Sequence, residues 1–496
     1  MSASTERKNR QLAREQGNDK KAIAAKEDAA KKKKSDLRFA LAGIGIALLI
    51  ALTIFLNSSA VYSFTAFKVG DKNFSSAEAN FYYSTQYQNW YNTYGSYASI
   101  FGLDASNGVS GLSQQACPML ENGTWRDYFL NYAEDQMIQV KATQDYAAQN
   151  GIALDADELA DIDSDIEMFD TYAKLYDFSS VDKFLAANFG NGVNKKIVRS
   201  CDADTALAAK VIDQVSNGFE YSDAQLKEAY AGFEGSRDLF DYASFTAENE
   251  AQADAVVKAY NKSKAGDAYA KFEDAVDSAA ASAPTHSSRA NATYLDTSSS
   301  EWLMDSARKN GDITTIPSEA EDDESVSVLL FISRDMNDYP VAQVRHILVK
   351  AEASEDGTYT DEAKAAAKAR AEEILAEFNA GDKTEESFAA LAELYSEDAG
   401  SNTNGGLYDS IAKGQTVEEF DAFCFAANRK NGDTAVVYGE SSAYAGYHVM
   451  YYVGEGELYC NILAENELRT NDTNEWLENI TSQYATSTGF GMKFVG

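Results

Sequence analysis

Residues 344–350 read VRHILVK and residues 446–453 read GYHVMYYV, and these two stretches decide the fold of the C-terminal half of the chain. Both are short apolar runs rich in β-branched and aromatic residues, as is typical of buried strands. Each contains one histidine, His346 and His448, in a chain with only 3 histidines. A lone histidine in a core strand is usually structural, so the segment between the strands must show whether this pair has a function.

The segment between these strands carries a series of landmarks. An Ala/Glu/Lys-rich helix is expected first, followed by FAALAELYSED at 388–398, Gly-Gly-Leu at 405–407, Gly-Gln at 414–415 and Gly-Asp at 432–433. With RHIL before them and GYH after them, the landmarks stand in the order found in parvulins. Residues 338–456 therefore resemble a parvulin-type peptidyl-prolyl cis/trans isomerase domain, which has an α+β fold.

This resemblance implies roles for individual residues. It places His346 and His448 as a hydrogen-bonded pair on neighbouring central strands beneath the substrate. It places Asp398 where relatives carry Cys or Asp, and Glu397 takes that position if the alignment is one residue out. Rotation about an X–Pro bond breaks no covalent bond, so no cofactor and no metal are expected. The proline ring is expected to bind against three residues: Leu407, Thr416 and Phe420.

The sequence also departs from the parvulin pattern. Relatives usually have Met at the position of Thr416 and often have Ser at the position of Ala445, and residues 408–410 lack the usual small and aromatic residues. These departures concern the rate of isomerisation more than the fold. The loop at 351–356 is acidic, whereas recognition of a phosphorylated substrate needs Arg or Lys. The resemblance therefore indicates a phosphate-independent isomerase.

Residues 238–337 look like a diverged copy of the same unit. Both stretches run from a strand through helices to a β-rich ending, and ARKNGD at 307–312 matches NRKNGD at 428–433. Chance similarity between two α+β stretches is the alternative. Aligning YASF with RHIL places Ala243 at the first histidine position, and the closing strand offers Leu or Phe at the second. The first copy is therefore expected to be a degenerate, non-catalytic parvulin-like domain.

The N-terminal region predicts a membrane anchor. Residues 39–56 carry no charge and are long enough, as a helix, to cross a bilayer, and basic residues of the leader at 1–36 precede them. We therefore predict a single-pass signal anchor at 37–58, with a cytoplasmic N-terminus and an extracytoplasmic main body. A cleavable signal peptide is the alternative. No Cys follows the apolar run, which argues against a lipoprotein.

The charge of the chain excludes one class of partner. The net charge is −35, and because the first 38 residues are basic, the rest of the chain carries 31 basic and 72 acidic residues. So acidic a surface repels nucleic acid, and no nucleic-acid partner is expected. The four cysteines lack metal-site spacing. Cys117 and Cys201 are candidates for a disulfide, with buried free thiols as the alternative.

The remaining regions complete the predicted architecture. Residues 59–235 predict an α-helical chaperone-like domain, and residues 457–496 predict a tail with a short helix around 473–484. The fold class is thus multidomain α and α+β: a transmembrane helix, a helical domain and two parvulin-like domains, the first degenerate.

The predicted order of domains resembles the organisation of the PrsA/SurA-type foldases. The chain is then an anchored isomerase that also binds unfolded or newly secreted polypeptides, and the sequence leaves open whether it forms a homodimer. A non-catalytic holdase with an inactive parvulin domain is the first alternative. A metal-binding surface protein that uses His346, His448 and Asp398 is the second.

Overall fold

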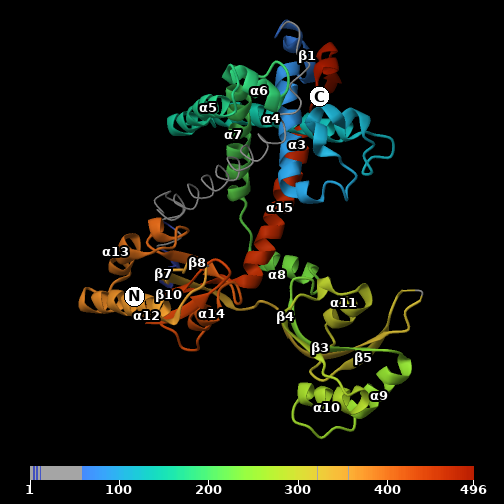
Figure 1. Ribbon diagram of the computed structural model, residues 1–496, viewed down its shortest axis with the longest axis vertical. Coiled ribbons are helices and arrows are strands. Elements are labelled where there is room, and N and C mark those ends of the chain that lie inside the picture. The colour runs from blue at the N-terminus through green and yellow to red at the C-terminus, as the bar shows by residue number, and fades with distance from the viewer. Residues whose placement is uncertain (1–3, 6, 9–11, 13–58, 321, 356) are drawn as a thin grey trace. The chain divides into compact units, whose positions relative to one another are not determined.

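The computed structural model describes residues 4–5, 7–8, 12, 59–320, 322–355 and 357–496. The chain divides into two compact units, one ending at Glu220 and completed by residues 469–496, the other spanning residues 221–468 (Figure 1). The predicted anchor at 37–58 lies outside the described residues. Within the described part of the chain, no helix combines the length and the apolar character needed to cross a membrane.

The first unit is built mainly of helices. Three of them begin with capping boxes. The side chains of Ser75, Thr124 and Asp155 accept from the backbone N–H three residues later, and their own N–H groups donate to the acidic side chain of that residue. Trp125, Tyr82 and Phe129 are fully buried and anchor the core. Its α-helices are α3 (Ser76–Tyr94), α4 (Trp125–Asn150), α5 (Ala156–Leu175), α6 (Val181–Phe189) and α7 (Lys195–Gly218). Its 3-10 helices are η2 (Ser59–Ser63), η3 (Gly95–Tyr97), η4 (Ala105–Gln114) and η7 (Phe490–Phe494).

The C-terminal residues differ from the predicted tail. Helix α15 runs over Tyr459–Thr481, so it begins earlier and is longer than the helix expected around 473–484. After it, β11 (Thr486–Thr488) pairs with β1 (Thr65–Val69), which also pairs with β2 (Lys72–Ser75). The end of the chain therefore completes the sheet of the first unit.

The candidate disulfide between Cys117 and Cys201 is absent, because all four cysteines are free thiols. Cys117 lies in the loop before α4, where its N–H donates to the carbonyl of Gly123, and Cys201 lies within α7. Burial raises the pKa of the Cys201 thiol, which keeps it protonated. Both residues therefore act as small core side chains, as the alternative interpretation held.

The second unit contains two four-stranded antiparallel sheets. Their strand orders are β4-β3-β6-β5 and β8-β7-β10-β9, which are the same order when each sheet is numbered from its own first strand. After α8 (Asp223–Gly232), the first sheet and its helices are β3 (Leu239–Ala247), α9 (Glu250–Tyr260), α10 (Ala268–Ala280), β4 (Thr285–Ala290), η5 (Ala292–Tyr294), α11 (Thr297–Met304), β5 (Ile313–Pro317) and β6 (Val326–Asp335). The second set is β7 (Pro340–Lys350), α12 (Asp361–Ala380), α13 (Glu385–Tyr395), η6 (Asn402–Asn404), β8 (Leu407–Ile411), α14 (Glu418–Cys424), β9 (Thr434–Glu440) and β10 (Ala445–Leu458).

The repeated RKNGD turn makes the same hydrogen bonds in both sheets. The side-chain amide of Asn310 donates to the carbonyl of Ile332 at 2.8 Å, and that of Asn431 donates to the carbonyl of Val453 at 2.8 Å. The N–H of the following glycine donates to Phe331 in one sheet and to Tyr452 in the other. These shared contacts support a duplication and fix the alignment, with Phe331 at the position of Tyr452.

This alignment corrects the residues expected at the two histidine positions. Counting back from Phe331 puts Ser327 at the position of His448, and Ser327 is where Leu or Phe was predicted. Ser244 pairs with Leu329 as His346 pairs with Met450, so Ser244, and not Ala243, corresponds to His346. Ala243 packs on the opposite face, in the core beneath α9 and α10. A shift of one residue along a strand reverses the face of every side chain.

Each face of the second sheet has its own layer of helices. Ile347 and Val449 pack beneath α12 and α13, whereas Val344 and Met450 pack beneath α14. Because side chains alternate along a strand, the even-numbered residues of β7 and β10 share the face that α14 covers. His346 and His448 belong to this even-numbered set.

Candidate active site

The two histidines meet in the middle of the second sheet. Strands β7 and β10 are antiparallel neighbours, and His346 lies opposite Met450 while His448 lies opposite Leu348. The two histidines are therefore diagonal neighbours across the strand pair, and their Nδ1 atoms lie 3.0 Å apart. The two residues are only 3% and 4% exposed, so the pair is shielded from bulk water.

Asp398 extends the histidine pair. It follows α13, and its Oδ2 lies 2.9 Å from Nε2 of His346. The same oxygen accepts from the hydroxyl of Ser401 at 2.6 Å and from the hydroxyl of Tyr408 at 3.0 Å. Glu397 instead accepts from the N–H of Lys350 at 2.5 Å. The structure therefore brings Asp398, and not Glu397, to the histidines.

The surroundings fix the charges of these groups. The hydrogen bond from His346 holds the pKa of Asp398 well below its usual range, and the Ser401 hydroxyl acts in the same direction. Burial, with His346 beside it, lowers the pKa of His448 to about 3. Burial and the Asp398 charge raise the pKa of Tyr408 to about 12. At neutral pH the site therefore holds a carboxylate, a neutral His448 and a protonated phenol.

These charges set the direction of the hydrogen bonds around an uncharged His346. An ionised Asp398 only accepts, so the imidazole donates to it from Nε2, and its Nδ1 is then left as an acceptor. His448 then donates from Nδ1 and accepts at Nε2. The hydroxyl of Tyr444 lies 2.9 Å from that Nε2 and donates to it. The hydrogen bonds thus run in one direction, from Tyr444 through His448 and His346 to Asp398.

Tyr444 and Ser401 were not among the predicted site residues. Sequence reasoning noted that Ala445 lacks the hydroxyl that relatives offer to the second histidine, but it did not consider the residue before it. Tyr444 supplies a hydroxyl from the start of the β10 hairpin. The tyrosine at 408 and the SEDAGS sequence at 396–401 were visible signals, but which of these hydroxyls face the carboxylate depends on the loop geometry.

The three residues predicted to bind the proline ring lie in different places relative to the histidines. Phe420 lies against both imidazoles, with ring centroids 5.4 Å from His346 and 5.2 Å from His448. Leu407 does not face them, because it packs in the core beneath α12 and α13. Its neighbour Tyr408 takes the place, with its ring centroid 5.1 Å from that of His346. Thr416 lies in the loop before α14, and its buried hydroxyl has no partner among the described residues.

The Gly-Gly turn brings the Asp398 loop up to β7. Gly406 accepts from the N–H of His346 at 2.8 Å and donates to the carbonyl of Ser401 at 2.8 Å. Its φ is +71°, and a Cβ there would lie 2.2 Å from the carbonyl oxygen of His346. No other residue fits this position. The turn therefore holds the strand and the loop in contact.

The arrangement does not resemble a metal centre. Within the described part of the chain, no group of three His, Cys, Asp or Glu side chains could hold a metal ion. His346 stands between the other two groups and uses both ring nitrogens for hydrogen bonds to them. The three side chains therefore do not face a common point, which argues against the metal-binding alternative.

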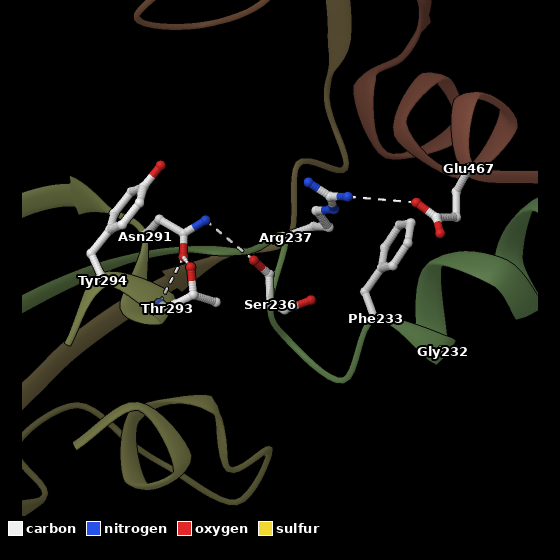
Figure 2. Close-up of a pocket in the computed structure, with 8 residues that line it drawn as sticks. All are labelled: Gly232, Phe233, Ser236, Arg237, Asn291, Thr293, Tyr294 and Glu467. Atoms are coloured by element: carbon white, nitrogen blue, oxygen red, sulfur yellow. Dashed lines mark hydrogen bonds and ion pairs between the residues drawn. The ribbon is translucent and has the colours of Figure 1, made fainter. Parts of the chain in front are cut away.

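A separate pocket of about 420 Å3 lies elsewhere in the second unit and contains none of these residues. Figure 2 shows hydrogen bonds and an ion pair among the residues that line it. Arg237 pairs with Glu467 at 3.5 Å, and Asn291 donates to the carbonyl of Ser236 at 3.2 Å. We therefore place the chemistry at the histidines and not in this pocket.

Residues 329–451 match the family model of the PPIC-type PPIase domain. This part of the chain is a parvulin-type isomerase domain. The chain is 31% identical over 151 residues to Foldase protein PrsA 3 of Bacillus cereus, covering 30% of this chain and 44% of that protein. It is 34% identical over 118 residues to Foldase protein PrsA 1 of Listeria innocua, covering 24% and 32%. The chain thus spans less than half the length of the curated relatives it matches.

A solved structure gives a similar match. The crystal structure of the peptidylprolyl isomerase PrsA from Bacillus cereus is 28% identical, covers 29% of this chain and 49% of that chain, and has a TM-score of 0.19. The match at 329–451 confirms the predicted resemblance to parvulins. The helical first unit and the two α+β sheets of the second unit agree with the predicted multidomain α and α+β chain.

We predict that Tyr444 is a positioning residue of the parvulin domain. Tyr444→Phe removes the donor to Nε2 of His448 and leaves that nitrogen without a partner, while the bond to His346 still holds the Nδ1–H tautomer. We expect kcat/KM to fall about tenfold, as for loss of one buried hydrogen bond. The Nε2 resonance of His448 should shift as it loses its hydrogen bond, while the Nδ1–H tautomer persists. Tyr438→Phe is the matched control, because that phenol pairs with Glu440 instead.

We predict that His448 makes the domain sensitive to acid. Its pKa is about 3 in the folded chain against 6.5 in the unfolded chain, so below pH 6.5 the unfolded state binds a proton that the folded state refuses. The free energy of unfolding therefore has its full value above pH 6.5, where His448 is neutral in both states, and it decreases as the pH falls from 6.5 towards 3. Between pH 6.5 and 4 this amounts to about 3 kcal/mol.

Hydrogen exchange of β7 and β10, corrected for the intrinsic exchange rate at each pH, measures this effect. The free energy of opening should fall with pH in the wild type relative to His448→Gln, which cannot titrate. The stability that ionised Asp398 contributes to the fold is also lost on acidification, but only as the pH passes below the ordinary carboxyl pKa of 3.8. The effects of His448 and Asp398 therefore fall in different pH ranges. Parallel curves for the wild type and the variant between pH 6.5 and 4 would contradict the assignment.

Proposed function

We propose that this chain is a membrane-anchored extracytoplasmic foldase that isomerises X–Pro bonds in unfolded or newly secreted polypeptides. The observation that carries the proposal is the chain of hydrogen bonds from Tyr444 through His448 and His346 to Asp398. The foldase names of the relatives support the class of client. The apolar run at 39–56 and the basic leader before it support the anchor.

The chemistry requires a site that favours a twisted amide. Resonance in the planar amide places partial charges on oxygen and nitrogen, and rotation removes this resonance at a barrier of roughly 20 kcal/mol. A dry surface therefore favours the less polar, twisted state over either planar isomer. The buried imidazoles and the ring of Phe420 supply such a surface, and Asp398 supplies a fixed negative charge beside it.

Tyr408 forms one wall of the site beside the histidines. Its ring lies over His346 and its hydroxyl is tied to Asp398, so the wall nearest the histidines is aromatic and held in place. We propose that the proline ring binds between this wall and Phe420, next to Thr416. The acidic loop at 351–355 offers no cation for a phosphate, which supports a phosphate-independent site.

A protease-coupled assay of the purified full-length chain tests the proposal. The substrate is a short non-phosphorylated X–Pro peptide, and acceleration above the thermal rate supports the isomerase. A folded wild type with no acceleration would remove the enzyme claim. The holdase alternative would then lead, and the unpartnered hydroxyl of Thr416 in the expected proline pocket is the observation in its favour. Suppression of aggregation of an unfolded protein would measure that activity separately.

A further inference from the structure

The first unit contains a groove that the isomerase chemistry does not use. It has a volume of about 440 Å3 and is lined by α3, α4 and α7, which pack against one another. This volume falls in the range of ligand-binding pockets, roughly 300–1,000 Å3. Its floor is apolar, because Val140 and Ala208 are buried there and Ile212 lies beside them.

Polar groups without partners line the same groove. Gln86 donates to Gln136, and Gln139 makes no side-chain hydrogen bond within the described residues. The side-chain oxygen of Gln86, the side-chain NH2 of Gln136 and the whole side-chain amide of Gln139 therefore have no partner within the described residues. None of these amide atoms is among the buried side-chain atoms without a partner, so they reach solvent and are accessible to a ligand with backbone-like donors and acceptors.

Thr205 points to the same conclusion by a different route. Elsewhere in the first unit, Thr85 and Thr143 donate to the carbonyl four residues before them, at 2.9 and 2.8 Å. Thr205 lines the groove, and its buried hydroxyl has no partner among the described residues. Leaving a buried hydroxyl without a hydrogen bond costs on the order of 1–3 kcal/mol. A bound chain would remove that cost.

The charges of the groove are all of one sign. Asp135 on α4 and Asp213 on α7 line it, and no Lys or Arg does. Neither carboxylate has an ion pair within the described residues, and burial raises the pKa of Asp135. The ring of Tyr132 stands at the edge and is 49% exposed. The groove thus combines an apolar floor, free amides, an aromatic edge and two carboxylates without counterions.

We propose that this groove binds unfolded polypeptide segments in which a Lys or Arg adjoins an apolar residue. The cationic head pairs with Asp135 and Asp213, its aliphatic stem lies on Val140 and Ala208, and the glutamines bind the backbone. The acidic body of the chain attracts such segments and repels acidic ones. This inference rests on the proposed foldase function, since it names the clients that the helical domain selects.

Fluorescence anisotropy with the purified full-length chain tests the groove. The probes are two labelled, unstructured peptides that differ only in Lys–Leu against Glu–Leu pairs. We expect the cationic peptide to bind at least about tenfold more tightly, and Asp135→Asn with Asp213→Asn to reduce that difference more than a change of two charges elsewhere does. Asp157→Asn with Glu167→Gln is the matched control, because it removes two exposed charges from α5, outside the groove.

A second variant separates binding from folding. Thr205→Val keeps the shape of the side chain and removes the unpartnered hydroxyl, so we expect weaker peptide binding together with unchanged or higher stability. Equal binding of both peptides by the wild type, or equal losses in the Asp double variant and its control, would overturn the proposal. X–Pro isomerisation of a short peptide should be unchanged in all these variants. An inactive wild type in that assay would refute the proposed enzyme while leaving this binding test intact.

Discussion

His346→Ala should lower kcat/KM for a non-phosphorylated X–Pro peptide by about two to three orders of magnitude. His346 is the central group of the site, with Nδ1 bonded to His448 and Nε2 bonded to Asp398. Its removal breaks the chain of hydrogen bonds at its middle and leaves the carboxylate without its imidazole donor. Loss of one preorganised donor typically costs about 10²–10³ in rate. The protease-coupled assay with the full-length chain measures it.

The chain offers its own control for this experiment. His286 is the third histidine, lies exposed on β4 of the first sheet and stacks on Tyr269. His286→Ala should keep the wild-type rate. His448→Ala should approach the His346→Ala value, because it removes the other half of the imidazole pair and leaves Nδ1 of His346 without its partner. Wild-type activity in a folded His346→Ala variant would show that the imidazoles only fill the core.

The histidine site was predictable because its residues sit on regular elements. His346 and His448 are on adjacent strands, and the order of motifs between them indicated which strands pair. Phe420 begins the buried face of α14, and it could be placed in the same way. Asp398 follows a helix whose end the sequence signals. In each case the position came from the resemblance to parvulins, and at Asp398 the structure decided between it and Glu397.

The errors were offsets of one residue at places where the sequence gives no register. Leu407 was chosen over Tyr408, and Ala243 over Ser244, and each choice put a side chain on the wrong face of its sheet. Register depends on which residue of a partner strand lies opposite, and in these sheets it also depends on a bulge near Val344 and on its counterpart near Tyr242. A single sequence contains no direct record of that pairing.

The pairing of β11 with β1 could not be predicted from the sequence for another reason. Strand β11 has three residues and no alternation of apolar and polar side chains, and all three are exposed. Its place depends on pairing with β1 at the other end of the described chain. Such non-local contacts leave no periodic signal in the sequence. The same applies to Tyr444, whose hydroxyl reaches His448 through the geometry of a hairpin.

Gly406→Ala should destabilise the parvulin domain by at least about 3 kcal/mol, which is large for a single methyl group. The added Cβ would lie 2.2 Å from the carbonyl oxygen of His346 and 2.9 Å from Cβ of Ala392. Strand β7 is central in its sheet, so the strand cannot move aside without breaking its pairing with β10. The turn must therefore separate from β7 and carry Ser401 away from Asp398.

Gly414→Ala separates this clash from backbone strain. Gly414 has a φ of +80°, close to the +71° of Gly406, but a Cβ there meets nothing within 4 Å. It should cost only the left-handed conformation of an alanine, about 1–2 kcal/mol. Hydrogen exchange of β7 and β10 in the full-length chain measures both variants. Equal losses would show that strain alone accounts for the effect. A larger loss in Gly406→Ala, with isomerase activity falling further than in Gly414→Ala, would show that the contact between turn and strand holds the site together.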